Sequence, residues 1–415
     1  MRFSAKVAVA MEALSRAQPA CEVGLNICVF LFLPILVLAS KGAAPLVGVA
    51  GACALCIAVT DGADAWRRVH GWAALFVVLV LLGVSSSLWA VNAERSLLIA
   101  LRLTGIFVAG LSLAAASSKI AAPRLLMMFF IAGMVVAFVL AALQGTTHGA
   151  LTAPFSRRPF SETALNQAEN AFALLLLPLS AMLVLRRNYA AAVALAVLSI
   201  AAISLLAGDT GKLAAAVGFA VAAGFYWRRR ALARVAAALS VVLIAVAPLT
   251  LPQLASNNAA REVAQGIKFS AWHRLEIWSF VGGKIAEKPV LGWGLDSSRA
   301  IPGGDVPIPD VPALLHETWL PLHPHNAALQ LWLELGAPGA ILLAIFVAGI
   351  WLALGKVPWP RLYAAAASGA TAATLTVALG SYGIWQEWLL ASEFLTAFLI
   401  LVMARLAQPM PEASR

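Results

Sequence analysis

Charged residues are scarce in this chain of 415 residues, where Asp, Glu, Lys and Arg together make up 12%. Soluble proteins carry about 25% charged residues and about 45–50% apolar ones. Hydrophobic residues make up 62% of this chain. The composition excludes a soluble globular enzyme, a disordered chain and a collagen-like repeat, and it predicts a polytopic membrane protein.

Cysteine is scarce as well, and the four cysteines are too few for a scaffold held together by disulfides. Cys53 and Cys56 have the spacing C-x-x-C, but they lie inside the apolar run 42–60, with no histidine nearby and no strand–helix context. Cys21 and Cys28 also lie in or beside apolar segments. We therefore interpret all four as packing residues rather than as a redox or metal site.

Twelve apolar segments are long enough to cross a membrane, because a helix needs about 20 mainly apolar residues to span the hydrocarbon core. They are 21–39, 42–60, 71–90, 98–117, 125–144, 168–185, 189–207, 212–227, 231–251, 327–354, 361–381 and 385–404. The predicted fold class is therefore an all-α polytopic membrane protein of about 12 transmembrane helices with one large outer loop.

Lysine and arginine are distributed unevenly between the two sides of these spans. With the N-terminus in the cytoplasm, the inner segments hold seventeen of them and the short outer segments hold five. Because positive charge marks cytoplasmic loops, both termini are predicted to be cytoplasmic. The net charge of +10 then reflects membrane topology, so membrane lipids and no nucleic acid are the expected partners.

The spans divide the chain into three regions. Residues 1–251 form an N-terminal membrane region of nine helices, and residues 252–326 form the large outer loop. Residues 327–415 form a C-terminal region of three helices with a short cytoplasmic tail. Five of the six histidines fall in outer segments, so chemistry is expected on the outer face.

His325 lies two residues before the span that starts at residue 327. A neutral imidazole with a pKa near 6.5 is suited to deprotonate a hydroxyl near pH 7, although a metal ligand or a structural histidine are alternatives. Asn326 is expected to cap the following helix. Glu334 lies on the opposite face of that helix from His325, and we interpret it as a buried acid whose partner the sequence does not identify.

Several cations lie where they can meet a phosphate group. Lys212 stands at the outer mouth between two spans, where it either binds phosphate or extends to the membrane interface. Arg261 and Arg274 lie in the basic first half of the large loop. This charge suits a lipid headgroup or a pyrophosphate. An amphipathic helix lying on anionic lipid explains the same charge equally well.

Two groups of residues resemble the motifs of bacterial O-antigen ligases and of the wider ligase and polymerase superfamily. They are His325, Asn326, Gly336 and Gly339, and, upstream, Arg274, Trp278 and the segment Pro-Val-Leu-Gly-Trp-Gly at 289–294. The twelve spans and the large loop between the ninth and tenth spans fit the same family, and the resemblance implies a GT-C-like architecture. Lys212 is a departure, because the family commonly has an Arg in this outer loop and Lys lacks the bidentate fork.

The resemblance implies transfer of O-antigen polysaccharide from undecaprenyl pyrophosphate to a sugar hydroxyl of lipid A–core, at the periplasmic face of a Gram-negative inner membrane. The large loop is then periplasmic, and His325 is the general base. Arg274, Lys212 and Arg261 are expected to stabilise the departing pyrophosphate. Arg157 and Arg158 are expected to hold acidic phosphates of lipid A–core.

Single displacement predicts inversion at the anomeric carbon. No metal or other cofactor is expected, because side-chain cations fill that role and the chain has no D-x-D motif. The alternatives are an O-antigen polymerase or a protein O-oligosaccharyltransferase of the same superfamily. A transporter of lipid-linked glycans is an alternative from another class.

Overall fold

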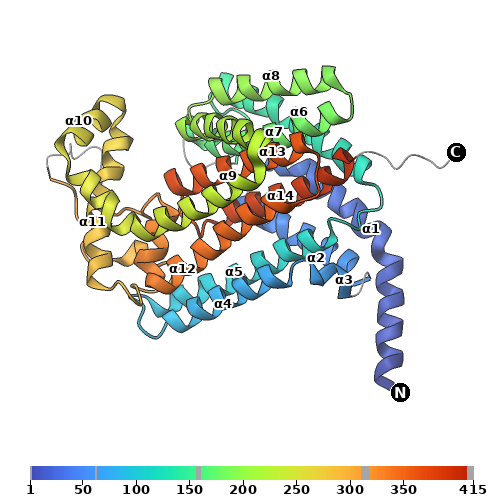
Figure 1. Cartoon of the computed structure of the whole chain (residues 1–415), viewed down its shortest axis with the longest axis horizontal. Helices are drawn as coiled ribbons and strands as arrows, with labels where there is room; N and C mark the ends of the chain where they lie inside the picture. Colours follow the sequence, from blue (N-terminus) through green and yellow to red (C-terminus); the bar gives the residue numbers. More distant parts are fainter. Residues whose placement is uncertain (1, 61–62, 156–159, 310–316, 409–415) are drawn as a thin grey trace.

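The computed structural model of the chain describes residues 2–60, 63–155, 160–309 and 317–408. These residues form helices joined by loops, and their β-structure is limited to one isolated bridge between Pro307 and Thr318. The protein is therefore an all-α protein, as the sequence predicts (Figure 1).

The helices follow one another with short connections over most of the chain. They are α1 (Arg2–Leu38), η1 (Ser40–Gly42), α2 (Ala43–Thr60), α3 (Ala63–Arg67), α4 (His70–Ser86), α5 (Ala93–Ala116), α6 (Pro123–Thr146), η2 (Glu162–Leu165), α7 (Asn166–Leu185), α8 (Tyr189–Leu205), α9 (Asp209–Ser256), α10 (Asn258–Ile267), α11 (Phe269–Glu287), η3 (Ser297–Ala300), α12 (Ala327–Lys356), α13 (Arg361–Gly380) and α14 (Glu387–Ala407).

Nine helices within the described ranges are long and apolar enough to cross a membrane, and α4 and α8 are shorter apolar helices of 17 residues each. The 48-residue helix α9 leaves helical geometry at Arg228 (φ −134°, ψ 48°), so it holds two of the predicted spans, 212–227 and 231–251. All twelve predicted segments thus fall largely on helices. The chain is a polytopic membrane protein.

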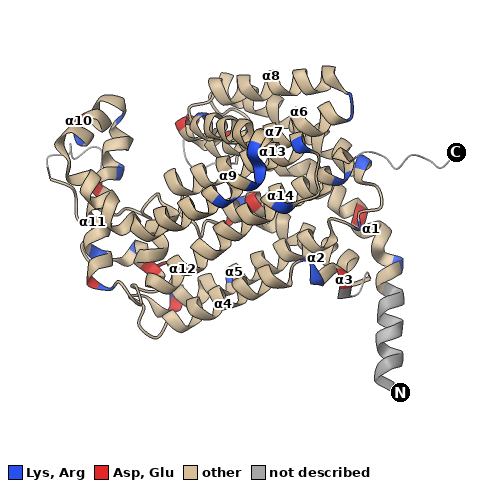
Figure 2. Cartoon of the chain, viewed as in Figure 1, with Lys and Arg blue, Asp and Glu red and all other residues tan. Residues whose placement is uncertain are grey.

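Two large apolar clusters hold the helices together. One is built mainly from α1, α2, α6, α7 and α14, and the other from α9, α11, α12 and α13. Helix α9 packs along both α12 and α13. Charged side chains are sparse along these helices and gather mostly near their ends (Figure 2). The helices α10 and α11 stand at one end of the molecule, and the beginning of α1 and the end of α14 lie toward the other (Figure 1).

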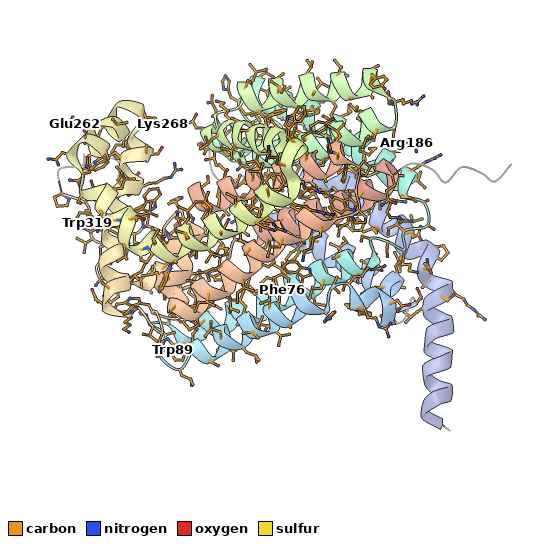
Figure 3. The ribbon with its side chains drawn as sticks, viewed as in Figure 1. Phe76, Trp89, Arg186, Glu262, Lys268 and Trp319 are labelled. Carbon is orange, nitrogen blue, oxygen red and sulfur yellow. The ribbon has the colours of Figure 1, made fainter. Side chains whose placement is uncertain are left out.

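Much of the predicted large loop is helical, since it contains α10 and α11. Helix α9 continues to Ser256, beyond the predicted start of the loop at 252, despite Pro248 and Pro252 within it. Asn257 then caps α10, because its Oδ1 accepts a hydrogen bond from the Ala260 amide at 3.1 Å. Lys268 and Trp319, which belong to this part, lie at the same end of the molecule (Figure 3). The side of the membrane on which they lie stays a prediction.

Candidate active site

The backbone around His325 is held in place at the start of α12. His325 has a left-handed conformation, with φ +54°. The next residue, Asn326, caps α12, since its Oδ1 accepts from the Leu329 amide at 3.0 Å. The predicted cap is confirmed. The Nδ2 of Asn326 also donates to the Leu379 carbonyl at 3.0 Å, which ties the start of α12 to the end of α13.

The His325 ring is oriented by a backbone carbonyl. Its Nδ1 lies 2.5 Å from the Ser381 carbonyl oxygen. Because a carbonyl only accepts, Nδ1 carries the proton and Nε2 keeps its lone pair. Burial and, to a smaller extent, the charge of Arg274 together lower the pKa of His325 to about 4, against the hydrogen bond to Ser381, which raises it. The imidazole is therefore neutral at pH 7, with Nε2 able to accept a proton.

Helix α11 supplies two residues to this site from one of its faces. Trp278 donates from Nε1 to the Pro324 carbonyl at 3.0 Å, immediately before His325. Arg274 lies one turn earlier on the same face. Its positive charge lowers the pKa of His325 and of His323, so the guanidinium lies near both rings.

Arg274 keeps its hydrogen-bonding capacity. Burial lowers the pKa of its partly buried guanidinium. Within the part of the chain that the structure describes, no carboxylate or carbonyl pairs with this side chain. A half-buried cation without a partner beside a neutral histidine is suited to bind an anion.

The motif segment 289–294 packs against the motif residues around Gly336. Helix α12 is broken at Gly336 (φ +62°, ψ −155°), a conformation open essentially to glycine alone. Three backbone hydrogen bonds of 2.8–3.0 Å join the segment 289–294 to residues 333–337. A Cβ at Gly336 would lie 2.2 Å from the Val290 carbonyl oxygen. Gly336 therefore serves a close approach of two backbones, whereas Gly339 packs on Leu335 of its own helix after the break.

Glu334 is fully buried beside this junction and has found its partners. Its carboxylate accepts hydrogen bonds from the Asp296 amide (2.7 Å), Ser298 Oγ (2.5 Å), Gln330 Nε2 (3.0 Å) and Trp385 Nε1 (2.5 Å). These donors come from the loop after 294, from α12 and from the loop before α14. Glu334 thus fixes the loop against the membrane helices rather than acting on His325.

The N-terminus of α9 approaches the same place. Thr210 Oγ1 donates to Ser381 Oγ at 3.3 Å, so the residue whose carbonyl holds His325 also contacts α9. Asp209 pairs with Lys268 Nζ at 2.9 Å and stands 3.9 Å from Lys212 Nζ. Lys212 therefore lies on the helix whose first turn contacts Ser381, and the carboxylate of Asp209 offsets part of its charge.

Sequence reasoning missed Glu169 on α7. Its side chain is fully buried, and Oε2 accepts from the Gly208 amide at 2.8 Å, directly before α9. A Cβ at Gly208 or Gly211 would collide with this carboxyl group. The signal was present, because an acid inside the apolar segment 168–185 is a functional candidate by default.

Ser381 and Tyr382 were missed too, and no signal marks them in the sequence, since they are uncharged residues between two apolar runs. Burial raises the pKa of Tyr382 to about 12. Its hydroxyl accepts a hydrogen bond from Asn170 Nδ2 at 3.4 Å.

Three further cations, Arg261, Arg157 and Arg158, are predicted to bind phosphate groups. Arg261 forms an ion pair with the buried Glu276, which occupies part of its guanidinium. Arg157 and Arg158 lie outside the described residues. The predicted role of each of these three cations stays a prediction.

Comparison with known proteins identifies the part of the chain that contains this site. The family model of the O-antigen ligases matches residues 194–344, which include Lys212, Arg274, His325 and Gly336. The chain is also similar to rickettsial proteins whose names contain the words polysaccharide ligase.

The relative from Rickettsia typhi is 28% identical over 285 residues, which cover 67% of each chain. The relative from Rickettsia prowazekii has the same identity and coverage. The relative from Rickettsia conorii is 31% identical over 203 residues, or 48% of each chain. Together with the sequence motifs, these similarities support the resemblance to the O-antigen ligases, and the family model covers the part of the chain that holds the candidate site.

Proposed function

We propose that the protein transfers a completed O-antigen polysaccharide from undecaprenyl pyrophosphate to a sugar hydroxyl of lipid A–core, at the periplasmic face of the inner membrane of a Gram-negative bacterium. One observation carries the proposal. The Nε2 of His325 is left free to accept a proton, and the guanidinium of Arg274, which has no ion-pair partner among the described residues, lies near this ring. A polysaccharide ligase needs a base for the acceptor and a cation for the donor, and both stand here side by side.

His325 acts as the general base. The acceptor hydroxyl oxygen attacks the anomeric carbon of the donor sugar while its proton passes to Nε2 of His325. The bond between the anomeric carbon and the pyrophosphate oxygen breaks, and the electron pair leaves with the lipid pyrophosphate. A single displacement inverts the anomeric centre. The Ser381 carbonyl stabilises the imidazolium that forms, because it accepts from Nδ1.

Arg274 and Lys212 stabilise the charge that develops on the pyrophosphate. The two side chains come from α11 and α9, so a diphosphate between them contacts cations on two sides. This arrangement supports metal-independent transfer, because the leaving group needs no proton and its charge is met by side chains. Arg261 contributes from its ion pair with Glu276.

An O-antigen polymerase uses the same donor, and the geometry of the base and the cations suits it as well. The two enzymes differ in the acceptor, which for a polymerase is another lipid-linked glycan. The experiment must therefore offer both acceptors separately.

The test is transfer by the purified protein, in EDTA, from undecaprenyl-pyrophosphate-linked O-antigen to O-antigen-free lipid A–core, followed by gel electrophoresis. We expect a ladder on lipid A–core that disappears in His325→Ala and persists in His70→Ala. His70 is a matched control because it lies on exposed α4 and bonds only to the Arg67 carbonyl.

Longer lipid-linked chains formed from the donor alone would indicate that the protein is a polymerase rather than a ligase. A ladder that requires an added divalent metal would refute metal independence. If protein that is shown to be folded forms neither product, this result would favour a transporter of lipid-linked glycans.

A further inference from the structure

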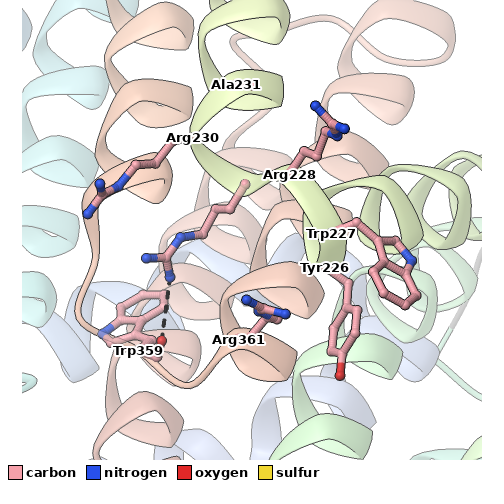
Figure 4. A pocket seen from close by; sticks show the side chains of 8 residues that line it. Tyr226, Trp227, Arg228, Arg230, Ala231, Trp359 and Arg361 are labelled. Atoms are coloured by element: carbon pink, nitrogen blue, oxygen red, sulfur yellow. Dashed lines mark hydrogen bonds between the residues drawn. The ribbon is translucent and has the colours of Figure 1, made fainter.

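A pocket of about 450 Å³ lies where α9 bends, at the opposite end of α12 from His325. It is lined by residues 226–231 of α9 together with Trp359 and Arg361 (Figure 4). The 30 residues of α12 correspond to about 45 Å of helix, so this pocket is separate from the candidate active site. We call it the α9 pocket.

The helix break gathers arginines into the α9 pocket. In a continuous helix, successive side chains point about 100° apart, so three consecutive arginines spread around the axis. Here the backbone leaves helical geometry at Arg228, and Arg228, Arg229 and Arg230 line the pocket together with Arg361 from the start of α13. A neighbouring pocket of about 270 Å³ adds Arg234 and Lys356.

The positive charge of the α9 pocket has no acidic counterpart close to it in the sequence. Residues 210–261 and 335–386 contain no Asp or Glu. Arg229 donates to the Trp359 carbonyl at 3.4 Å, and Arg361 stands 5.8 Å from the centre of the Tyr226 ring. Of these arginines, none forms an ion pair with any residue that the structure describes. The guanidinium groups are therefore available to an external anion.

Aromatic side chains surround the charge. Trp227 is 75% exposed and Tyr226 is 37% exposed, at a place where two membrane helices, α12 and α13, end and begin. Trp and Tyr favour the headgroup level of a bilayer. Basic pockets between membrane helices on the cytoplasmic side suit acidic lipid headgroups. The charge count predicts this side to be cytoplasmic.

We propose that the α9 pocket binds the phosphate groups of an anionic phospholipid, with the arginines on the phosphate oxygens and the aromatic residues beside the glycerol and the first acyl carbons. Guanidinium groups make strong bidentate contacts to phosphate, and four arginines line this pocket of about 450 Å³. Binding at the bend fixes α9 against α13.

The test measures cardiolipin binding to the full-length protein in neutral detergent by native mass spectrometry. The double variant Arg228→Gln/Arg361→Gln should bind about 25-fold more weakly than the unchanged protein, at about fivefold for each arginine. Arg186→Gln/Arg187→Gln is the matched control, because it removes two exposed arginines from the loop between α7 and α8, neither of which lines the α9 pocket. Its affinity should stay within about twofold.

Each other outcome overturns the proposal. Equal losses in the two double variants would mean that only the overall surface charge attracts the lipid. Unchanged binding in Arg228→Gln/Arg361→Gln would place the lipid elsewhere. Phosphatidylcholine bound as tightly as cardiolipin would remove the role of charge, and glycerol phosphate bound as tightly would make the ligand a soluble phosphate.

A further variant protects the result from misfolding. Arg228→Lys/Arg361→Lys keeps the charge but loses the planar fork, so its affinity should fall between those of the unchanged protein and the Gln variant. If both variants unfold at the same temperature as the unchanged protein without lipid, the losses report binding. If the Gln variant does not fold, an unchanged affinity in the Lys variant overturns the bidentate contact.

Discussion

Trp278→Phe removes one hydrogen bond behind the proposed base while keeping the aromatic ring. The Nε1 of Trp278 donates to the Pro324 carbonyl at 3.0 Å, and this carbonyl precedes His325 directly. An acceptor left without its partner in a partly buried place costs about 1–3 kcal/mol. If this energy is lost from the placement of Nε2 in the transition state, kcat falls about tenfold to a hundredfold, since about 1.4 kcal/mol corresponds to a factor of ten.

Trp332→Phe is the matched control. Trp332 donates from Nε1 to the Ile244 carbonyl at 2.8 Å, which is the same kind of bond in a partly buried place between α12 and α9. Both substitutions should lower the unfolding temperature by similar amounts. Only Trp278→Phe should lower kcat, with the KM for the lipid-linked donor nearly unchanged.

The assay is initial-rate ladder formation on lipid A–core, combined with a double-mutant cycle. If Trp278 acts through His325, adding Trp278→Phe to His325→Ala should cost little more than His325→Ala alone. Equal losses of kcat in Trp278→Phe and Trp332→Phe, or additive losses in the cycle, would refute a positioning role for Trp278.

Three further substitutions test other parts of the site. Gly336→Ala should destabilise the protein by at least about 1–3 kcal/mol, because alanine is strained at this φ and ψ and its Cβ meets the Val290 carbonyl. Thermal unfolding measures this loss of stability. The control Gly283→Ala, whose Cβ meets nothing within 4 Å, should leave the stability of the protein unchanged. Arg274→Gln should lower kcat/KM for the donor about tenfold to a hundredfold, with Arg274→Lys in between, and an unchanged kcat/KM would exclude a contact with the pyrophosphate. Glu334→Gln should destabilise the protein by about 1.5–3 kcal/mol, since an amide replaces a buried carboxylate that accepts four hydrogen bonds, and a stability equal to that of the unchanged protein would contradict this account.

The membrane helices could be predicted because their signal is local. A segment such as 125–144 is apolar throughout and needs no knowledge of its neighbours, so its helix α6 follows from composition alone. The break in α12 was less accessible. Gly336 belonged to a recognisable motif, but the reason for it is the segment 289–294, more than forty residues earlier in the chain.

The candidate site was predictable mainly for residues that stand out in an apolar chain by their charge or by a ring nitrogen. His325 and Arg274 stand out in an apolar chain, whereas Ser381 contributes only its carbonyl to His325, and every residue has one. The partners of Glu334 were equally hidden, because three of the four come from segments that are remote in the sequence. Backbone contacts between distant segments depend on the fold, and the local sequence does not encode them.

The low pKa of His325 leads to a last prediction, about the order of events. A pKa of about 4 keeps the imidazole neutral, but such a group is a weak base for a sugar hydroxyl. The charge of Arg274 is one cause of the low value. A bound pyrophosphate neutralises Arg274 and places negative charge near the ring, which raises the pKa of His325 because an anion favours the imidazolium. The donor thereby strengthens the base that deprotonates the acceptor.

The pH dependence of the rate distinguishes free from donor-bound enzyme. Activity requires neutral His325, so it is lost as the pH falls through the pKa of this group. The acid limb of kcat/KM, which reports the free enzyme, should lie well below pH 6.5, and the acid limb of kcat should lie at higher pH. In Arg274→Gln the acid limbs of kcat/KM and of kcat should lie closer to each other, because the free enzyme then lacks the cation that the donor would neutralise. Coincident limbs in the unchanged protein would show that donor binding leaves the base as it was, and the proposed coupling between pyrophosphate and His325 would be wrong.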